Sequence, residues 1–165
     1  MREKTRALTV SALCAAVDTV LLSLSMVLPA QRLALLCLSS LGVVACLCTN
    51  GRGWALGTYG VTGLLSILLL PDYRIALAYV LFCGYYPVLK LNIEGVASAV
   101  GRAALKLFYF NLALCGFFYL AHIPMALPLW IPLLAANAGF WLYDFALGKL
   151  ILLYSRKIAG RIKNG

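Results

Sequence analysis

Long apolar stretches separated by short polar turns run along almost the whole chain. A helix rises ~1.5 Å per residue, so about 20 apolar residues cross the ~30 Å hydrocarbon core of a bilayer. The stretches approach this length, and the turns between them contain Gly, Pro, Asn and charged residues. The pattern predicts six membrane-spanning helices, at about residues 7–28, 33–49, 54–70, 75–91, 105–121 and 129–154.

One segment, residues 92–104, breaks this apolar pattern. Charged residues occur in pairs at both of its ends: Lys90 and Glu94 are four residues apart, and so are Arg102 and Lys106. Several small residues lie between the two pairs. Residues four apart lie on one face of a helix. We expect an amphipathic segment at the cytoplasmic surface that leads into the following helix.

Composition supports the membrane assignment. Hydrophobic residues make up 64% of the chain and charged residues 12%, with a mean hydropathy of +0.96. A soluble domain averages ~45–50% apolar and ~25% charged residues. The 165 residues therefore predict one all-α domain, a polytopic membrane protein built as a bundle of six transmembrane helices, without room for a separate soluble domain.

The distribution of basic residues predicts the orientation. With six spans, all of the 14 Lys and Arg except Arg32 and Arg74 fall on one side of the membrane. Lys and Arg concentrate in cytoplasmic loops, so both termini are expected in the cytoplasm and the protein in the plasma membrane. Topology and contact with anionic lipids explain the net charge of +9 better than binding to nucleic acid does.

Motifs for catalysis or metal binding do not occur in the sequence. It has no HExxH, GxSxG or P-loop pattern, and its single histidine, His122, cannot complete a catalytic triad with any obvious partners. The six cysteines lie inside apolar runs without a CxxC spacing and are interpreted as small buried hydrophobic residues. We therefore expect neither an enzyme nor a cofactor or metal site.

The first predicted helix carries a strip of small side chains formed by Ser11, Ala12, Ala15 and Ala16. Small residues let two helix backbones approach closely in lipid, so the strip predicts docking of a partner helix.

Asp18 lies near the centre of the same helix. An ionised carboxylate costs at least ~2.5 kcal/mol in mid-bilayer, so Asp18 should face the bundle. There we expect it either protonated or hydrogen-bonded to Thr58, Thr62 or Asn137. A functional role and a packing role remain equally open for this residue.

The last predicted helix carries a second polar stripe, formed by Asn137, Trp141, Asp144 and Gly148. Asp144 lies at about the depth of Lys90 and Lys106, and an ion pair between helices is favoured over substrate chemistry. Asn137 and Trp141 lie closer to the outer surface. These two residues are therefore the better candidates for binding a ligand from outside.

The size, the span count and the helix 1 pattern RALTVSALCAA at residues 6–16 resemble the S components of energy-coupling factor transporters. In that family a small-residue motif on helix 1 docks a membrane-embedded coupling subunit, which works with partner ATPases. The resemblance implies a small-molecule-binding membrane subunit that takes a neutral, vitamin-like ligand from outside. Its outward pocket would collect Arg32, Tyr73, Tyr79, His122, Trp130 and Asn137.

Other resemblances keep the function open. Residues 82–90 and 142–150 resemble segments of small membrane proteins of Gram-positive bacteria to which no activity can be attached. In size and span count the chain is also similar to the rod-shape-determining membrane protein D family, which implies a scaffold or assembly protein of the cell envelope. A third alternative is a proton-coupled carrier that uses Asp18.

Overall fold

The computed structural model describes residues 2–122 and 130–163, with side chains for residues 3–122 and 130–154. The described residues form helices and contain no strand. The longer elements are α1 (Arg2–Val27), α4 (Arg52–Leu69), α7 (Ala99–Ala121) and α8 (Trp130–Lys163). Shorter elements make up the rest: η1 (Pro29–Gln31), α2 (Arg32–Leu38), α3 (Leu41–Asn50), α5 (Tyr73–Ala78), the π-helical turn η2 (Tyr79–Cys83) and α6 (Tyr86–Glu94).

The second predicted span, residues 33–49, is interrupted and forms α2 and α3. The break lies at Ser39 and Ser40, whose hydroxyls donate hydrogen bonds of 2.7 Å to the carbonyls of Leu36 and Cys37. Such local bonds compete with the regular helical pattern. Gly42 is the second residue of α3, and its backbone packs against Asp18 of α1.

The fourth predicted span, residues 75–91, is also irregular. Its middle is the π-helical turn η2, closed by a 2.8 Å hydrogen bond from the Gly84 amide to the Tyr79 carbonyl. Pro87 has no amide to donate and lies in the first turn of α6, where a helix needs no such donor. The segment therefore changes course before Pro87, and α6 continues to Glu94.

The expected amphipathic segment at 92–104 does not form a separate element. Its first residues complete α6, and α7 begins at Ala99, six residues before the predicted start at Leu105. The Ser98 hydroxyl caps α7 by accepting a hydrogen bond of 3.2 Å from the Gly101 amide. The charged residues on both sides of this cap are typical of a surface helix, but the cap starts α7 at Ala99 instead.

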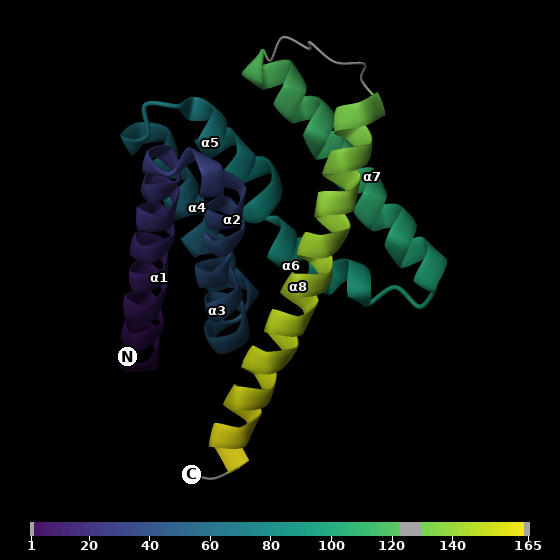
Figure 1. Cartoon of the computed structure of the whole chain (residues 1–165). Helices are drawn as coiled ribbons and strands as arrows, with labels where there is room; N and C mark the ends of the chain where they lie inside the picture. The colour runs from purple at the N-terminus through teal and green to yellow at the C-terminus, as the bar shows by residue number, and fades with distance from the viewer. Residues whose placement is uncertain (1, 123–129, 164–165) are drawn as a thin grey trace.

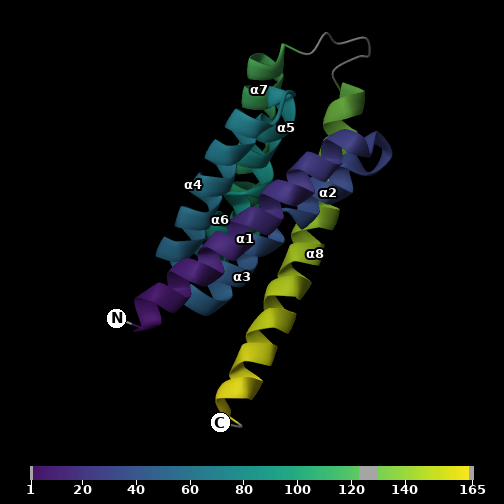
Figure 2. The same cartoon turned by 90° about the vertical axis from the view of Figure 1, so that its left-hand side faces the viewer.

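The helices form two groups (Figure 1). α1 packs against α2, α3 and α4, and a view from the side shows α1 crossing in front of α3 (Figure 2). α7 and α8 cross each other on the opposite side, with α5, η2 and α6 between the two groups. α1 begins and α8 ends at the same end of the molecule (Figures 1 and 2).

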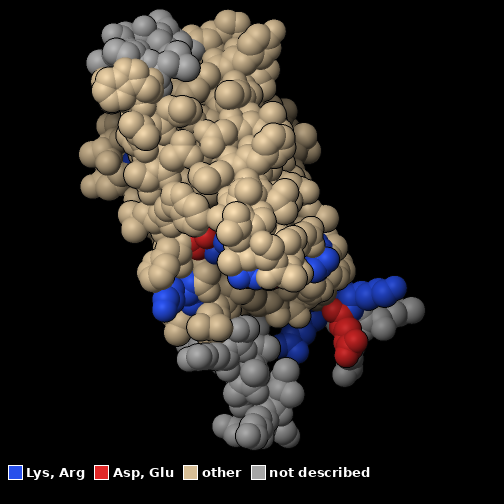
Figure 3. All heavy atoms as spheres, turned by 90° about the vertical axis from the view of Figure 1, so that its right-hand side faces the viewer, with Lys and Arg blue, Asp and Glu red and all other residues tan. Residues whose placement is uncertain are grey.

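Four stretches of the described residues are long and apolar enough to cross a membrane: Glu3–Val27, Pro29–Asn50, Tyr73–Glu94 and Ala99–Ala121. α4, with 18 residues, and α8, with 34 residues, are not among them. Most of the charged side chains visible on one face gather toward the end where α1 begins (Figure 3). The structure thus fits a helical protein with several apolar helices compatible with membrane insertion.

Candidate functional site

A partly open cavity of about 480 Å³ lies between the two helix groups. Its walls come from α2, α5, η2, α6, α7 and α8, at Leu33, Leu36, Cys37, Ala78, Phe82, Cys83, Tyr86, Tyr109, Phe110, Leu114, Phe117, Phe118, Ala135, Ala136, Gly139, Phe140 and Tyr143. Pockets for small molecules usually have volumes of about 300–1,000 Å³. The cavity is therefore large enough for a small organic ligand.

The polar atoms of the three lining tyrosines are already bonded within the protein. The Tyr86 hydroxyl donates to Asp144 Oδ1 at 2.6 Å, and that of Tyr109 donates to the Leu81 carbonyl at 2.6 Å. The Tyr143 hydroxyl donates to the Ser40 hydroxyl at 3.0 Å. A ligand in the cavity would therefore meet aromatic rings and aliphatic groups.

Stacked rings form the wall nearest to α8. Phe110 and Phe140 stack with ring centroids 4.4 Å apart, and Tyr86 meets Phe140 edge to face at 5.2 Å. Ala135, Ala136 and Gly139 precede Phe140 on α8 and also line the cavity. Because their side chains are small or absent, α8 leaves a space there.

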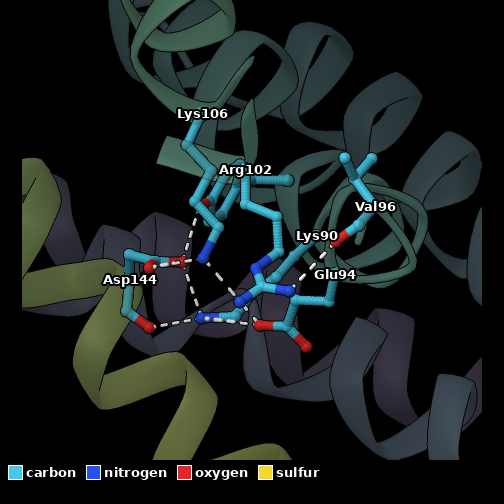
Figure 4. A network of polar contacts seen from close by, with 7 residues as sticks. Lys90, Glu94, Val96, Arg102, Lys106 and Asp144 are labelled. Atoms are coloured by element: carbon cyan, nitrogen blue, oxygen red, sulfur yellow. Dashed lines mark hydrogen bonds and ion pairs between the residues drawn. The ribbon is translucent and has the colours of Figure 1, made fainter. Parts of the chain in front are cut away.

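A buried ion cluster, defined as Asp144 with Lys90 and Lys106, lies next to the cavity (Figure 4). Lys90 Nζ lies 2.6 Å from Asp144 Oδ1, and Lys106 Nζ lies 2.8 Å from Oδ2. These residues come from α6, α7 and α8, and each is at most 9% exposed. The expected ion pair between helices is confirmed, and Asp144 has both lysines as partners.

Two further contacts complete the ion cluster. Lys90 Nζ also donates to the Asp144 carbonyl, and half-exposed Glu94 lies 3.7 Å from Lys90 and 3.9 Å from Lys106. The two carboxylates therefore balance the two ammonium groups. At Gly148 an added Cβ would lie 3.1 Å from Lys90 Nζ, so the absence of a side chain there lets Lys90 pass close to α8.

Comparisons with protein-family models, with curated proteins and with solved structures give no match. They give no support to the resemblance to S components, which stays a prediction. The case for a function therefore depends on the geometry of the chain itself.

None of the seven residues predicted to bind a ligand lines the cavity. The side chains of Trp130 and Trp141 are 62% and 43% exposed, and His122 is an exposed residue with a positive φ of 47° at the end of α7. Arg32 lies 3.9 Å from Asp72, and Tyr79 is fully buried. The structure does not bring these residues together in one pocket.

Asn137 makes contacts within the bundle instead of with the cavity. Its amide exchanges hydrogen bonds of 3.2 and 3.3 Å with the amide of Asn111 on α7. Polar pairs of this kind link helices in membranes. The sequence predicted a ligand contact for Asn137, whereas the structure places this half-buried side chain against a neighbouring helix.

The sequence analysis predicts ligand contacts on the polar stripe of α8, whereas the residues that line the cavity lie on another face of this helix. Ala136, Gly139, Phe140 and Tyr143 recur at spacings of three, one and three, which marks one face of a helix. Small residues beside aromatic ones along this face are a signal in the sequence. By itself, that signal does not distinguish a cavity from close packing with another helix.

The small strip on α1 is divided by the fold. Ser11 and Ala15 are buried at 7% and 2% exposure, whereas Ala12 and Ala16 are exposed. The expected docking surface of four small residues is therefore wrong as a single surface. Ser11 and Ala15 instead face the rest of the protein, where small side chains permit close packing of α1.

Asp18 faces the interior as expected, but its partner is different. The Gly42 amide of α3 donates a hydrogen bond of 3.1 Å to Asp18 Oδ1. An added Cβ at Gly42 would lie 2.3 Å from Asp18 Oδ2, so α3 passes directly beside this carboxylate. The predicted bonds to Thr58, Thr62 or Asn137 are not formed, because the break before α3 brings a free backbone amide closer.

Proposed function

We propose that this protein is a multi-pass membrane subunit that binds a small, uncharged and largely apolar molecule in the cavity between its two helix groups. The single observation that supports this proposal is the composition of the cavity wall. It presents rings, aliphatic chains and small residues, while the hydroxyls of its three tyrosines bond to the protein. A charged ligand would be desolvated there without a charged partner.

The ligand class follows from the same contacts. The polar residues that the sequence predicts to bind a neutral, vitamin-like compound, such as Arg32 and Asn137, lie outside the cavity wall. Aromatic rings on α7 and α8 favour stacking on a flat or unsaturated molecule. We therefore favour an apolar ring system or hydrocarbon over a polar metabolite.

The proposal includes six spans with both chain ends in the cytoplasm, with α4 and α8 as the additional spans. α1 begins and α8 ends at the same end of the molecule, as an even number of spans requires (Figure 1). Most of the charged side chains visible in Figure 3 gather at that end. The cavity involves the second half of α7 and the first half of α8, so it would lie nearer to the outer surface.

Docking to a coupling subunit, with its ATPases, is part of the same proposal. The resemblance to S components places that contact on helix 1, and the exposed residues of its small strip are Ala12 and Ala16. These two residues lie one turn apart on the outer face of α1, where a partner helix would approach closely.

The direct test is to fill the cavity from α8. We expect Ala136→Phe to remove a molecule that copurifies with the wild-type protein in mild detergent, because the new ring would occupy the ligand space. Mass spectrometry of the intact protein and of its organic extract would detect the bound molecule. Ala138→Phe is the matched control, since Ala138 is exposed on the same helix and does not line the cavity.

The outcomes separate binding from packing. Equal retention of the molecule in Ala136→Phe and Ala138→Phe would contradict binding in this cavity. A wild-type protein that carries no molecule, and whose thermal unfolding does not respond to a panel of apolar and polar compounds, would contradict the function itself.

A further inference from the structure

Three buried oxygen atoms near η2 have no hydrogen-bond partner among the described residues. They are Oδ2 of Asp18 on α1, the hydroxyl of Thr62 on α4 and the hydroxyl of Tyr79 on η2. All three residues are fully buried, with 0% exposure. A buried polar group without a hydrogen bond destabilises the fold, so three such atoms in one region call for a partner.

These atoms belong to one cluster. The Tyr79 and Thr62 side chains lie beside each other, and the Asp18 carboxylate is close enough to act electrostatically on Tyr79. The Gly42 amide holds the other carboxylate oxygen, Oδ1, from the α3 side. Oδ2 is therefore fixed in position while it lacks a partner of its own.

Asp18 also lacks a positive partner within the described part of the chain. Among the described side chains, no Lys, Arg or His forms an ion pair with it. Lys90 and Lys106 bind Asp144, and Arg32 lies beside Asp72. A buried charge in a membrane protein normally pairs with another charge or marks an ion pathway. When ionised, Asp18 thus provides one negative charge that no described basic side chain balances.

We propose that Asp18, Thr62 and Tyr79 bind a single Na⁺ ion between α1, α4 and η2. Carboxylate and hydroxyl oxygens are the ligands that hard cations prefer, and one carboxylate balances one positive charge. A divalent ion such as Ca²⁺ usually binds several carboxylates, and a single carboxylate would leave one of its positive charges unbalanced. π-helical turns such as η2 occur frequently at functional sites, which agrees with this location.

The ion site is distinct from the cavity, and its residues do not line the cavity wall. The two are nevertheless neighbours, because Phe82 and Cys83 of η2 line the cavity while Tyr79 of η2 belongs to the ion site. The Na⁺ proposal does not depend on the proposed function, since it uses different residues and a different ligand.

The test measures the unfolding temperature of the purified full chain in detergent. Titrations with NaCl, KCl and choline chloride at constant ionic strength separate a specific ion from a general salt effect. We expect Na⁺ to raise the unfolding temperature in a saturable manner, since a ligand that binds only the folded state stabilises it. Binding of radioactive Na⁺ should saturate at about one ion per chain, and Asp18→Asn should abolish both effects.

Variants that keep the Asp18 carboxylate provide a second measurement. They test Na⁺ binding even if Asp18→Asn fails to fold. Thr62→Val and Tyr79→Phe should each weaken the apparent Na⁺ affinity about tenfold, because each removes one oxygen ligand. Thr19→Val is the matched control. Thr19 is also buried on α1, but its hydroxyl donates to the Ala15 carbonyl at 2.8 Å, so the Na⁺ affinity should stay unchanged.

Three results would overturn the proposal. The first is an unfolding temperature that is the same in all three salts. The second is an undiminished Na⁺ effect in Asp18→Asn, or in both hydroxyl variants. The third is stabilisation by low pH alone without any response to Na⁺, which would assign a proton to this carboxyl group.

Discussion

At the scale of single residues, the ion cluster of Asp144, Lys90 and Lys106 is the clearest determinant of the structure. The sequence predicted the ion pair because helical depth can be counted along each span, and these residues lie at similar depths. Two features were not predictable in this way. The Tyr86 hydroxyl also donates to Asp144, and Glu94 balances the second lysine. Both depend on how α6 lies beside α8.

Loss of the carboxylate from this cluster should be strongly destabilising. Asp144→Ala leaves two buried ammonium groups with only half-exposed Glu94 nearby, and we expect a loss of about 3–5 kcal/mol in the free energy of unfolding. Unfolding in detergent by increasing fractions of sodium dodecyl sulfate would measure this loss.

A matched variant tests whether burial causes the effect. Lys149→Met removes an exposed lysine five residues further along α8, whose ammonium lies 5.4 Å from the centroid of the Phe145 ring. We expect a change below about 1 kcal/mol, since exposed cation–π contacts are weak. Similar losses in Asp144→Ala and Lys149→Met would argue against a structural role for the ion cluster.

At the scale of elements, breaks in two helical segments position the buried Asp18 carboxylate and the residues that line the cavity. The breaks before α3 and at η2 place Gly42 beside Asp18 and separate Tyr79 from the cavity residues that follow it. The apolar patterns located these segments but treated each as one uniform span. Serine hydroxyls can also bond to the backbone of a continuous helix, so the bonds of Ser39 and Ser40 do not by themselves predict a break. The break depends in addition on how α3 packs against α1.

The two faces of α1 should respond differently to larger side chains. Ala15→Leu should destabilise the protein by about 1–3 kcal/mol, because Ala15 is 2% exposed and the new side chain has to enter a packed interior. Ala12→Leu should leave stability within about 0.5 kcal/mol, since Ala12 is exposed.

The same pair of variants tests the docking proposal. Ala12→Leu should reduce copurification with a membrane-embedded coupling subunit, while the free energy of unfolding measured in sodium dodecyl sulfate stays unchanged. If Ala12→Leu destabilises the isolated chain as much as Ala15→Leu does, then both faces of α1 pack within this protein, and α1 offers no free surface to a partner.

At the scale of the whole molecule, the orientation in the membrane is the main expectation. Positive loops remain in the cytoplasm. A reporter enzyme that is active only outside the cell should therefore be inactive when fused after Gly51 or after Gly95, and active when fused after Asp72. Activities of fusions at these three positions, normalised to expression, measure the topology.

The opposite pattern, with activity after Gly51 and Gly95 only, would reverse the orientation and turn the cavity toward the cytoplasm. Activity at all three positions would contradict the assignment of α4 as a span. α4 has 18 residues, begins at Arg52 and is followed by Asp72, so the fusions on its two sides are the most informative.

The sequence by itself determined the all-helical architecture, the approximate positions of the apolar segments and the inward direction of Asp18 and Asp144. These properties depend on local composition and on the high cost of placing charge in hydrocarbon, both of which can be judged along one helix. Tertiary structure decided the rest: the breaks in two segments, the division of the α1 strip and the location of the cavity. Each of these depends on how one helix is rotated against its neighbours, and contacts between distant residues set that rotation.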